Sequence, residues 1–535
     1  MIKEWIRQAE NGEPVWLGDV HAALAVAAGT KPFTMRLTLP GGKKRVFTLP
    51  LPEAQNEKEE QFLLSYLEAE MYNILSALGG TELCFCLQGE AQKQLAEAAI
   101  CAFEQPESGY NRILRELRRI TRFLGQTEFR FTFADKAEAE IQSESRTAAG
   151  LAETLRVAAQ AAMYGARAGI DVGGTDIKSV LSVKGQLVAA REYDWNPSSH
   201  KTAEETIQPI LSELKAMMQG RADRLDSIGL SYPDVCIRSR ICGGETPKTM
   251  GIRTNEAVDY EAEFAKLTAI NERLAELCKD GASIRITNDG NIAAYTAALE
   301  SAHSADASGI AKGCFAHAFG TSLGTGWVNA AGAIPENPLE IYDFIIDIGS
   351  WPQKAIPPED LRSVCNENSR LPGADRYLGQ ASAFRYAWAL APELLQGYAE
   401  EKKGLLSLPG NKRKPCLEHL MQETEKGNQA AQEVFRQVGR AFARVSREIT
   451  RILRPEADTR CLFGRFVKRQ CCFELIRAGF EELIPDITLT AADESIACSP
   501  LMQQLACLEG KTVAQFGQAV GALVFGCEEG KNNYV

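Results

Sequence analysis

The sequence predicts an α/β protein, and three patterns carry that prediction. Short apolar strands recur along the chain with amphipathic helices between them. Two Gly- and Thr-rich turns interrupt strands in two distant segments, and a further strand runs into Asn-Asp before an Ala-rich helix. Strands and helices mixed on this scale are typical of α/β sheet domains.

Length and composition bound the class of protein. The chain has 535 residues, 45% hydrophobic and 24% charged, with a net charge of −11. That length corresponds to about three domains, with ample apolar material for large cores. Phosphate contacts need clustered Lys and Arg, so the acidic balance argues against nucleic acid as a partner. Arg115, Arg118, Arg119 and Arg122 are one local basic cluster, which we interpret as a solvated helix face; a basic patch is the alternative.

Targeting and metal signals are weak in this sequence. The N-terminus has no apolar stretch of signal-peptide length, and no run of about 18 apolar residues predicts a membrane span. We therefore expect a cytoplasmic protein with no membrane partner. Its fifteen cysteines form no Cys-x-x-Cys pair and its five histidines follow no ligand spacing, so no zinc site is expected.

Residues 1–165 form the first predicted unit, a mixed α/β domain of unknown role. Alternating strands at 32–39 and 45–51 flank Gly41-Gly42, which predicts a hairpin. A helix with one apolar face follows and ends at Gly79-Gly80. The remaining predicted elements are a strand at 82–87, two helices, a strand at 128–133 and a helix at about 144–163. No phosphate loop, metal cluster or nucleophile motif occurs there.

Two further units follow, at 166–304 and 305–512, and a closing helix at about 513–530 is assigned to the first of them. The elements predicted for 166–304 are strands at 168–172, 227–232 and 284–287, a hairpin at 179–193 and a helix at 203–219. Those predicted for 305–512 are strands at 313–319, 327–329 and 460–463 and helices at 378–400 and 427–453. Pro- and polar-rich stretches at 351–375 and 404–416 predict loops over a cleft.

The first chemical signal is the stretch 169–178, in which a strand ends in Asp171 before Gly173-Gly174-Thr175. Two glycines let the backbone approach a phosphate closely, and successive N–H groups in such a turn make an anion-binding concavity. The Asp171 carboxylate suits Mg²⁺ held through water. An ordinary hairpin turn with a solvated acid is the alternative.

The second signal repeats the first at 319–327, where Gly320, Thr321 and Ser322 separate two strands. Small residues and hydroxyls suit phosphate oxygens. Two such turns, one from each of two similar units, predict a clamp on one nucleotide triphosphate. Two unrelated tight turns are the alternative.

The third signal is the stretch 284–294, where a strand runs into Asn288-Asp289 before a helix. An acid at a strand–helix junction is well placed for general-base work. Phosphoryl transfer needs positioning, charge neutralisation and an acceptor for the hydroxyl proton. Simple helix capping by Asp289 is the alternative.

In order and spacing, these three segments resemble the ROK group of sugar kinases and sugar-responsive repressors, within the actin–hexokinase–Hsp70 superfamily. The resemblance spans roughly 166–530. It is specific in the three segments and loose elsewhere. The stretch 460–468 weakly resembles the group's adenosine-side turn, with Gly464 kept and Arg465 in place of the second glycine. The stretch 513–526 resembles its closing helix.

The resemblance implies two ribonuclease-H-like, actin-like lobes around a nucleotide cleft, with ATP and Mg²⁺ as cofactors. By the same resemblance, Asp289 is the general base, Asn288 contacts the acceptor, Asp171 serves Mg²⁺ and Gly464 lies beside the adenosine. The residues implied at the ATP phosphates are Gly173, Gly174, Thr175, Lys178, Gly320, Thr321 and Ser322.

The sequence also departs from the group, chiefly on the acceptor side. The usual Glu-x-Gly-His reads Glu340-Ile341-Tyr342-Asp343, so Glu340 and Asp343 are the expected substrate contacts and the His is missing. The Cys-rich zinc loop is absent. The usual Pro-Gly is Pro233-Asp234, and the Asn-containing sugar loop is not recognisable within Cys242–Arg253. Nor does the first unit match the winged helix–turn–helix of the repressors, which argues against DNA binding.

The leading hypothesis is an ATP-dependent kinase for a sugar or polyol, with an acceptor that the sequence does not identify. Two alternatives stay open: a non-catalytic nucleotide- or sugar-binding regulator of the same fold, and an ATPase coupled to a partner protein through residues 1–165. The oligomeric state is also open, a homo-oligomer included.

Overall fold

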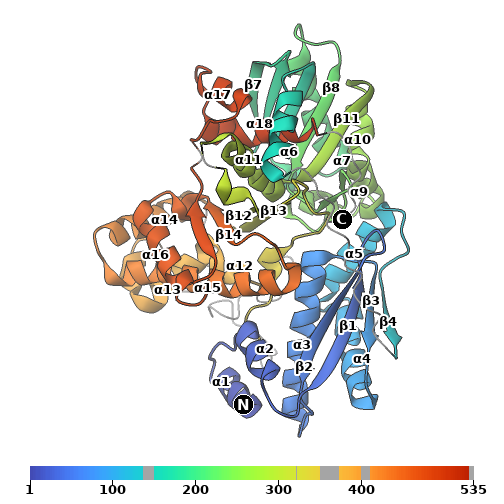
Figure 1. Cartoon of the computed structure of the whole chain (residues 1–535), viewed down its shortest axis with the longest axis vertical. Coiled ribbons are helices and arrows are strands. Elements are labelled where there is room, and N and C mark those ends of the chain that lie inside the picture. Colours follow the sequence, from blue (N-terminus) through green and yellow to red (C-terminus); the bar gives the residue numbers. More distant parts are fainter. Residues whose placement is uncertain are drawn as a thin grey trace.

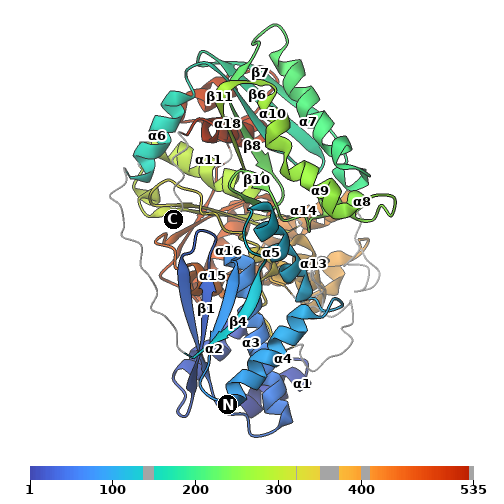
Figure 2. The same ribbon diagram turned by 90° about the vertical axis from the view of Figure 1, so that its right-hand side faces the viewer.

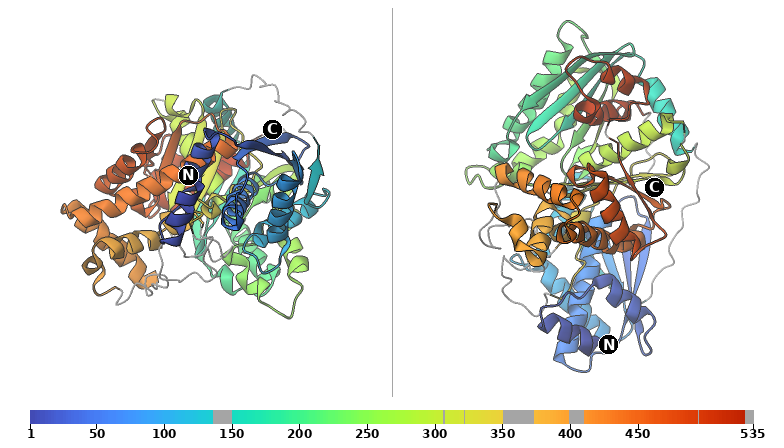
Figure 3. Two further views of the ribbon diagram at one scale, coloured as in Figure 1. Left: turned by 90° about the horizontal axis from the view of Figure 1, so that it is seen from below. Right: turned by 90° about the vertical axis from the view of Figure 1, so that its left-hand side faces the viewer.

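The computed structural model describes residues 1–135, 150–305, 307–320, 322–349, 373–398, 410–493 and 495–528. Across these ranges the chain is α/β, as predicted, with two four-stranded sheets, one five-stranded sheet and a two-stranded ribbon. Figure 1 and the right-hand view of Figure 3 show three parts stacked along the long axis, with the N-terminal part at one end. No helix among the described residues is long and apolar enough to cross a membrane.

The N-terminal sheet has the strand order β2-β1-β3-β4. The predicted hairpin is confirmed: β1 and β2 pair antiparallel, and Gly41 and Gly42 take positive φ in the turn. The prediction of the helix ending at Gly79 is also confirmed. The elements of this part are α1 (Ile2–Glu10), α2 (Leu17–Ala25), β1 (Lys31–Thr38), β2 (Lys44–Leu51), α3 (Glu57–Leu78), β3 (Glu82–Cys86), α4 (Glu90–Glu104), α5 (Asn111–Phe123) and β4 (Arg130–Ala134). After a gap in the described residues, α6 (Leu151–Ala161) packs in a different core, with α11 (Asp289–His303) and α18 (Val513–Phe525).

The five-stranded sheet has the order β11-β8-β5-β6-β7, with β8 parallel to both β5 and β11 and the other pairs antiparallel. The closing helix α18 lies directly on this sheet, because Gly169 and Gly229 leave no Cβ between them and the α18 backbone. The elements are β5 (Ala166–Val172), β6 (Asp176–Val183), β7 (Gln186–Asp194), α7 (Ala203–Met218), β8 (Leu225–Tyr232), β9 (Cys236–Ile237), β10 (Arg240–Ile241), α8 (Met250–Arg253), α9 (Tyr260–Thr268), α10 (Ile270–Ala275), β11 (Cys278–Asn288), α11 (Asp289–His303), α17 (Pro500–Ala506) and α18 (Val513–Phe525).

The remaining sheet has the order β13-β12-β14-β15. Two predictions about this part are wrong. The helix expected at 378–400 ends at Leu390, with a 3₁₀ turn from Pro392, and the loop expected at 404–416 is helical from Gly410 although Pro415 lies inside it. The stretch 350–372 lies outside the described residues, as does 399–409. The elements are β12 (Gly313–Phe319), β13 (Leu323–Asn329), α12 (Asp375–Leu378), α13 (Gln380–Leu390), α14 (Gly410–Glu425), α15 (Gln429–Leu453), β14 (Thr459–Phe463), α16 (Gln470–Glu481) and β15 (Thr488–Ala491).

One continuous apolar core joins the N-terminal part to the β12–β15 part. Its buried residues come both from α1–β4 and from the segments between β12 and β15. Polar contacts cross the same boundary: Asn73 of α3 exchanges hydrogen bonds with the backbone of Ile345, and Arg45 donates to the last carbonyls of α15. The boundaries predicted at 165 and 304 stay predictions.

Helix α11, which follows β11 of the five-stranded sheet, contacts the backbone of β13 in the β12–β15 sheet. A Cβ on Gly290 would lie 2.3 Å from the carbonyl oxygen of Thr325, and one on Gly326 would lie 1.8 Å from the carbonyl oxygen of Gly290. Both distances are far below van der Waals contact, and neither carbonyl can rotate away. The first turn of α11, which carries Asp289, is therefore held against β13.

Gly326→Ala should destabilise the protein by about 3 kcal/mol, because the added methyl must displace the backbone of α11. Thermal unfolding followed by circular dichroism measures the loss. The control is Gly309→Ala, where a Cβ would meet nothing within 4 Å. An unchanged melting temperature for Gly326→Ala would show that α11 and β13 are not in contact.

Candidate active site

The first predicted phosphate turn lies between β5 and β6. The N–H of Gly173 donates to the carbonyl of Asp176 at 2.8 Å, and Gly174 and Thr175 are exposed. A Cβ on Gly174 would have a single neighbour within 4 Å, the Cε of Lys248 at 3.9 Å. Packing within the chain therefore does not explain this glycine, and its predicted contact with an ATP phosphate stays a prediction.

Asp171 lies at the end of β5 and accepts a hydrogen bond from the Ser231 hydroxyl at 2.7 Å. Burial raises its pKa to about 6, against the Ser231 hydrogen bond. The negative charge of Asp289 also raises this pKa, and the positive charge of Lys178 lowers it. Lys178 is the residue opposite Asp171 in the β5–β6 pairing, and its ammonium pairs with Asp176. Its predicted role at the ATP phosphates stays a prediction.

A hydrated Mg²⁺ fits this carboxylate. Mg²⁺ takes one or two carboxylates and keeps several waters, and a bound cation would offset the burial that raises the Asp171 pKa. Among the described residues, no group of three or more His, Cys, Asp or Glu could hold a metal ion.

Asn288, and not only Asp289, caps helix α11. The Asn288 side chain accepts from the N–H of Gly290 at 2.8 Å and donates to the carbonyl of Asp234 at 3.0 Å. Both ends of its amide thus have partners within the chain, and its predicted contact with the acceptor stays a prediction.

Asp289 begins α11 with a half-buried side chain, and one carboxylate oxygen accepts from the N–H of Gly290 at 2.9 Å. Burial raises its pKa; the charge of Lys248 and the Gly290 N–H lower it, and the charge of Glu340 raises it further. Asp289 is thus electrostatically coupled to Asp171, to Lys248 and to Glu340. These residues come from four segments far apart in the sequence.

Lys248 is a residue that the sequence reasoning missed. It lies in the Gly-rich stretch after β10, in a 3₁₀ turn at Pro247–Thr249, and reaches the space beside Gly174 and Asp289. A cation between a phosphate turn and a candidate base suits a transferring phosphoryl group. The only sequence signal was its position within Cys242–Arg253.

The second predicted phosphate turn, at Gly320–Ser322, is shorter than the sequence indicated, since β13 begins at Leu323. Thr321 lies outside the described residues. Asp375 accepts from the N–H of Leu323 at 2.9 Å and from the Ser322 side chain, which anchors the turn. A Cβ on Gly320 would be 3.7 Å from its nearest neighbour, so this turn is open as well.

Packing within the chain explains why residue 464, predicted to lie beside the adenosine, is a glycine. It has φ +97°, and a Cβ there would lie 2.5 Å from the carbonyl oxygen of Phe319, the last residue of β12. Gly464 therefore lies next to the second turn, while its predicted contact with adenosine stays a prediction.

Glu340 and Asp343, the predicted acceptor contacts, share one partner from the N-terminal part. The Arg112 guanidinium pairs with Asp343 and, at 2.8 Å, with Glu340. Asp343 is fully buried and also accepts from the Tyr72 hydroxyl at 3.1 Å; burial raises its pKa to about 6, against the charge of Arg112. Their assignment to the acceptor stays a prediction, but both carboxylates are bridged to α5.

The interpretation of the α5 arginines as a solvated face is wrong for Arg119. Arg119 is 3% exposed, donates to the carbonyl of Gly243 and pairs with Glu261 of α9 at 2.7 Å. Arg122 reaches the same Glu261, and Arg115 pairs with Glu245. Figure 2 shows α5 at the edge of the N-terminal part that faces α9 and β10. The arginines were misjudged because their acidic partners lie far away in sequence.

Comparisons with known proteins give a fold-level likeness. The chain is similar to solved structures of ROK family proteins: a glucokinase from Streptomyces griseus in complex with glucose and AMPPNP (15% identity, 68% of this chain and 100% of that chain, TM-score 0.43), a hexokinase from Thermus thermophilus (15%, 68% and 97%, 0.43) and a transcriptional regulator homologous to the E. coli MLC protein (13%, 88% and 100%, 0.44). A scan against protein-family models finds no match, and a search of curated proteins finds none. At these identities and TM-scores, the activity of this chain has to be inferred from its own residues.

Asp234 gives the site a predicted pH dependence. Burial raises its pKa to about 7, against hydrogen bonds from the N–H groups of Gly244 and Val235. Between pH 4 and pH 7 the folded state therefore keeps a proton that the unfolded state has released, so this residue makes the free energy of unfolding fall as the pH rises through that range.

Asp234→Asn should make that fall shallower, as measured by urea unfolding at several pH values. Asp223→Asn, at an exposed position, is the control and should leave the slope as in the wild type. Equal slopes in the wild type and in Asp234→Asn would contradict the raised pKa.

Proposed function

We propose that this chain transfers the γ-phosphoryl group of ATP to a hydroxyl of a sugar or polyol, with Asp289 as the general base. On this proposal the β5–β8–β11 sheet with α18 and the β12–β15 sheet are the two actin-like lobes, and the turns at 173–175 and 320–322 hold the ATP phosphates.

The observation that carries the proposal is the position of Asp289: the backbone contact of Gly290 and Gly326 holds the start of α11 against β13, and Lys248 lies beside Gly174 of the first phosphate turn. The Asp289 carboxylate senses Asp171 behind the first phosphate turn, Lys248 beside that turn, and Glu340 in the acceptor segment. A base that must act between a phosphate and a hydroxyl needs neighbours of these three kinds. A residue that only capped a helix would need none of them, and Asn288 already provides a cap.

Each residue then has a defined task. Asp289 accepts the proton of the acceptor hydroxyl. The hydroxyl oxygen forms a bond to the γ-phosphorus, and the bond between that phosphorus and the leaving ADP oxygen breaks. Lys248 neutralises charge on the transferring group, and Gly174 and Gly320 give the phosphates room. Asp171 would hold a hydrated Mg²⁺, which supplies further neutralisation of phosphate charge.

A second candidate function is favoured by the ion pairs of Arg112. Because the chain itself engages Glu340 and Asp343 through α5, a regulator that binds nucleotide or sugar without turnover is compatible with the same arrangement. Such a protein would bind ligand and release no ADP. An ATPase coupled to a partner would release ADP with no acceptor present.

Asp289→Asn should lower kcat by about 10²–10⁴-fold, because the amide cannot accept the hydroxyl proton. The assay measures ADP release with MgATP and a panel of hexoses, amino sugars and polyols. Asp280→Asn, at an exposed position of β11, the strand before α11, is the control. Acceptor-dependent turnover that persists in Asp289→Asn would refute the assignment of the base, and the absence of turnover with every acceptor in the panel would favour the regulator.

Lys248→Met should shift the acidic limb of the kcat/KM profile to higher pH. The charge of Lys248 lowers the pKa of Asp289, so its loss leaves the base protonated to a higher pH. The variant should also lose rate at its pH optimum. Lys201→Met, at an exposed position, is the control. An unshifted acidic limb would show that the charge of Lys248 does not act on Asp289.

A further inference from the structure

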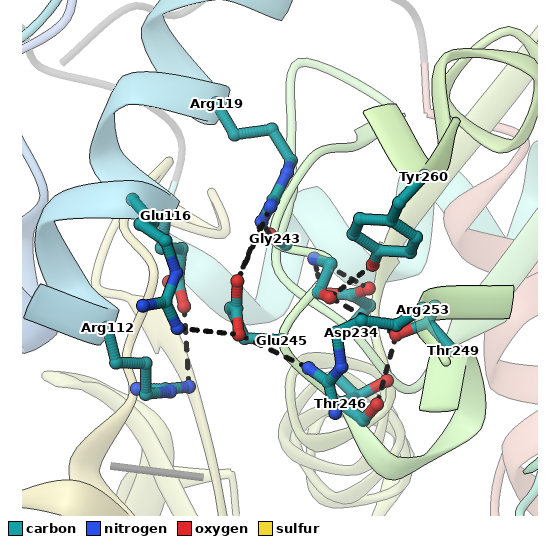
Figure 4. Close-up of polar contacts among 12 residues, drawn as sticks. Arg112, Glu116, Arg119, Asp234, Gly243, Glu245, Thr246, Thr249, Arg253 and Tyr260 are labelled. Carbon is teal, nitrogen blue, oxygen red and sulfur yellow. Dashed lines mark hydrogen bonds and ion pairs between the residues drawn. The ribbon is translucent and has the colours of Figure 1, made fainter. Parts of the chain in front are cut away.

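Helix α5 turns one charged face toward the acceptor side of the site. Arg112, Glu116 and Arg119 follow one another at spacings of four and three, which places them on one face of a helix. Figure 4 shows these side chains pointing toward the segment that carries Gly243 and Glu245. All three are at most 3% exposed, so this face is an interior surface.

Glu116 lies at the centre of a group of charges drawn from three distant segments. Its carboxylate is 3.3 Å from the Arg112 guanidinium, which also binds Glu340. Burial raises its pKa well above the usual range, against the charge of Arg112, and the charges of Glu340, Asp234 and Glu245 raise it further.

The same Glu340 connects Glu116 to the reacting centre. Its charge raises the pKa of Asp289 as well as that of Glu116. Asp234 is a second link, since its carbonyl accepts from Asn288, the residue before Asp289. The charged face of α5 and the candidate base therefore border one continuous polar region.

Four buried polar atoms in this region have no hydrogen-bond partner among the described residues. They are the Oε1 of Glu116, the Nε of Arg112, the Oγ1 of Thr246 and the Oδ1 of Asp343. Glu116 is 1% exposed and Arg112 is 2% exposed, so bulk water does not cover these groups. Buried polar atoms are costly to leave unpaired, and such atoms beside a catalytic site point to a ligand.

The chemistry of these atoms defines the ligand. The Glu116 carboxyl accepts a hydrogen bond when it is ionised and can also donate one when its raised pKa keeps it protonated. A guanidinium N–H needs an acceptor, and a threonine hydroxyl takes either. An ammonium group only donates, and a carboxylate or phosphate only accepts. Hydroxyl groups do both, so a molecule with several hydroxyls matches the set.

We propose that Glu116 and Arg112 of α5, together with Thr246, bind hydroxyl groups of the acceptor. This inference rests on the proposed phosphoryl transfer. It makes the N-terminal part of the chain one wall of the acceptor site, so that specificity is set by α5 as well as by Glu340.

The test separates acceptor binding from structural support. Glu116→Ala removes the unpaired oxygen, while Glu116→Gln keeps a carbonyl oxygen in its place. With the acceptor identified by the ADP-release panel, KM for the acceptor should rise by about tenfold or more in Glu116→Ala. Glu116→Gln should recover most of the loss, and KM for ATP should stay unchanged in both. A structural role would move kcat and both KM values together.

Two further variants complete the design. Thr246→Val, which removes only the hydroxyl, should raise KM for the acceptor even if Glu116→Ala fails to fold. Glu104→Ala removes a partly exposed carboxylate of α4 that pairs with Arg118, and it should change neither KM. The acceptor should raise the melting temperature, measured without ATP, less in Glu116→Ala and Thr246→Val than in the wild type. The increase in Glu104→Ala should equal that of the wild type.

The outcomes distinguish this inference from the proposed function. An unchanged acceptor KM in Glu116→Ala and Thr246→Val, with turnover lost in Asp289→Asn, overturns the inference and leaves the kinase intact. If no acceptor supports turnover, the kinase proposal fails. In that case a polyol that raises the melting temperature of the wild type but not of Glu116→Ala still supports the site, and no stabilisation by any member of the panel overturns it.

Discussion

The backbone contact between α11 and β13 is the constraint on which the site depends. Gly290 and Gly326 allow carbonyl groups of one element to lie where side chains of the other would be. This fixes the start of α11 between the five-stranded sheet and the β12–β15 sheet. The Asp289 side chain is thereby left where the charges of Lys248 and Glu340 act on it. Asn288 supports the same junction through its hydrogen bonds to Gly290 and to the carbonyl of Asp234.

A second constraint is the buried charge of Arg112. A guanidinium at 2% exposure needs anionic partners, and it finds them in Glu116 on its own helix and in Glu340 and Asp343 across the interface. Removing one partner of such a group leaves an uncompensated buried charge, which is strongly destabilising. The N-terminal part and the acceptor segment are therefore coupled by charge as well as by their shared apolar core.

Elements whose signal is local were predictable. The hairpin at Gly41-Gly42, the helix ending at Gly79 and the turn at Gly173-Gly174 follow from residues within a few positions of each other. Predictions from composition were wrong where tertiary packing favoured another structure. The stretch from Gly410 looks like a loop because of its Pro and polar residues, yet it forms α14, with Leu417 and Leu420 buried in the core.

The sequence alone determined the three chemical segments and their order, because each depends on glycines and acids at strand ends. Only the tertiary structure decided which of them meet Lys248, and that Glu340 and Asp343 meet Arg112. Neither Lys248 nor Arg112 has a local motif around it. It also decided that Arg119 of α5 is buried, because the Arg119–Glu261 ion pair joins positions that no local pattern connects. Periodicity reports which face of an element is apolar, whereas the partner of a buried charge is known only once the chain has folded.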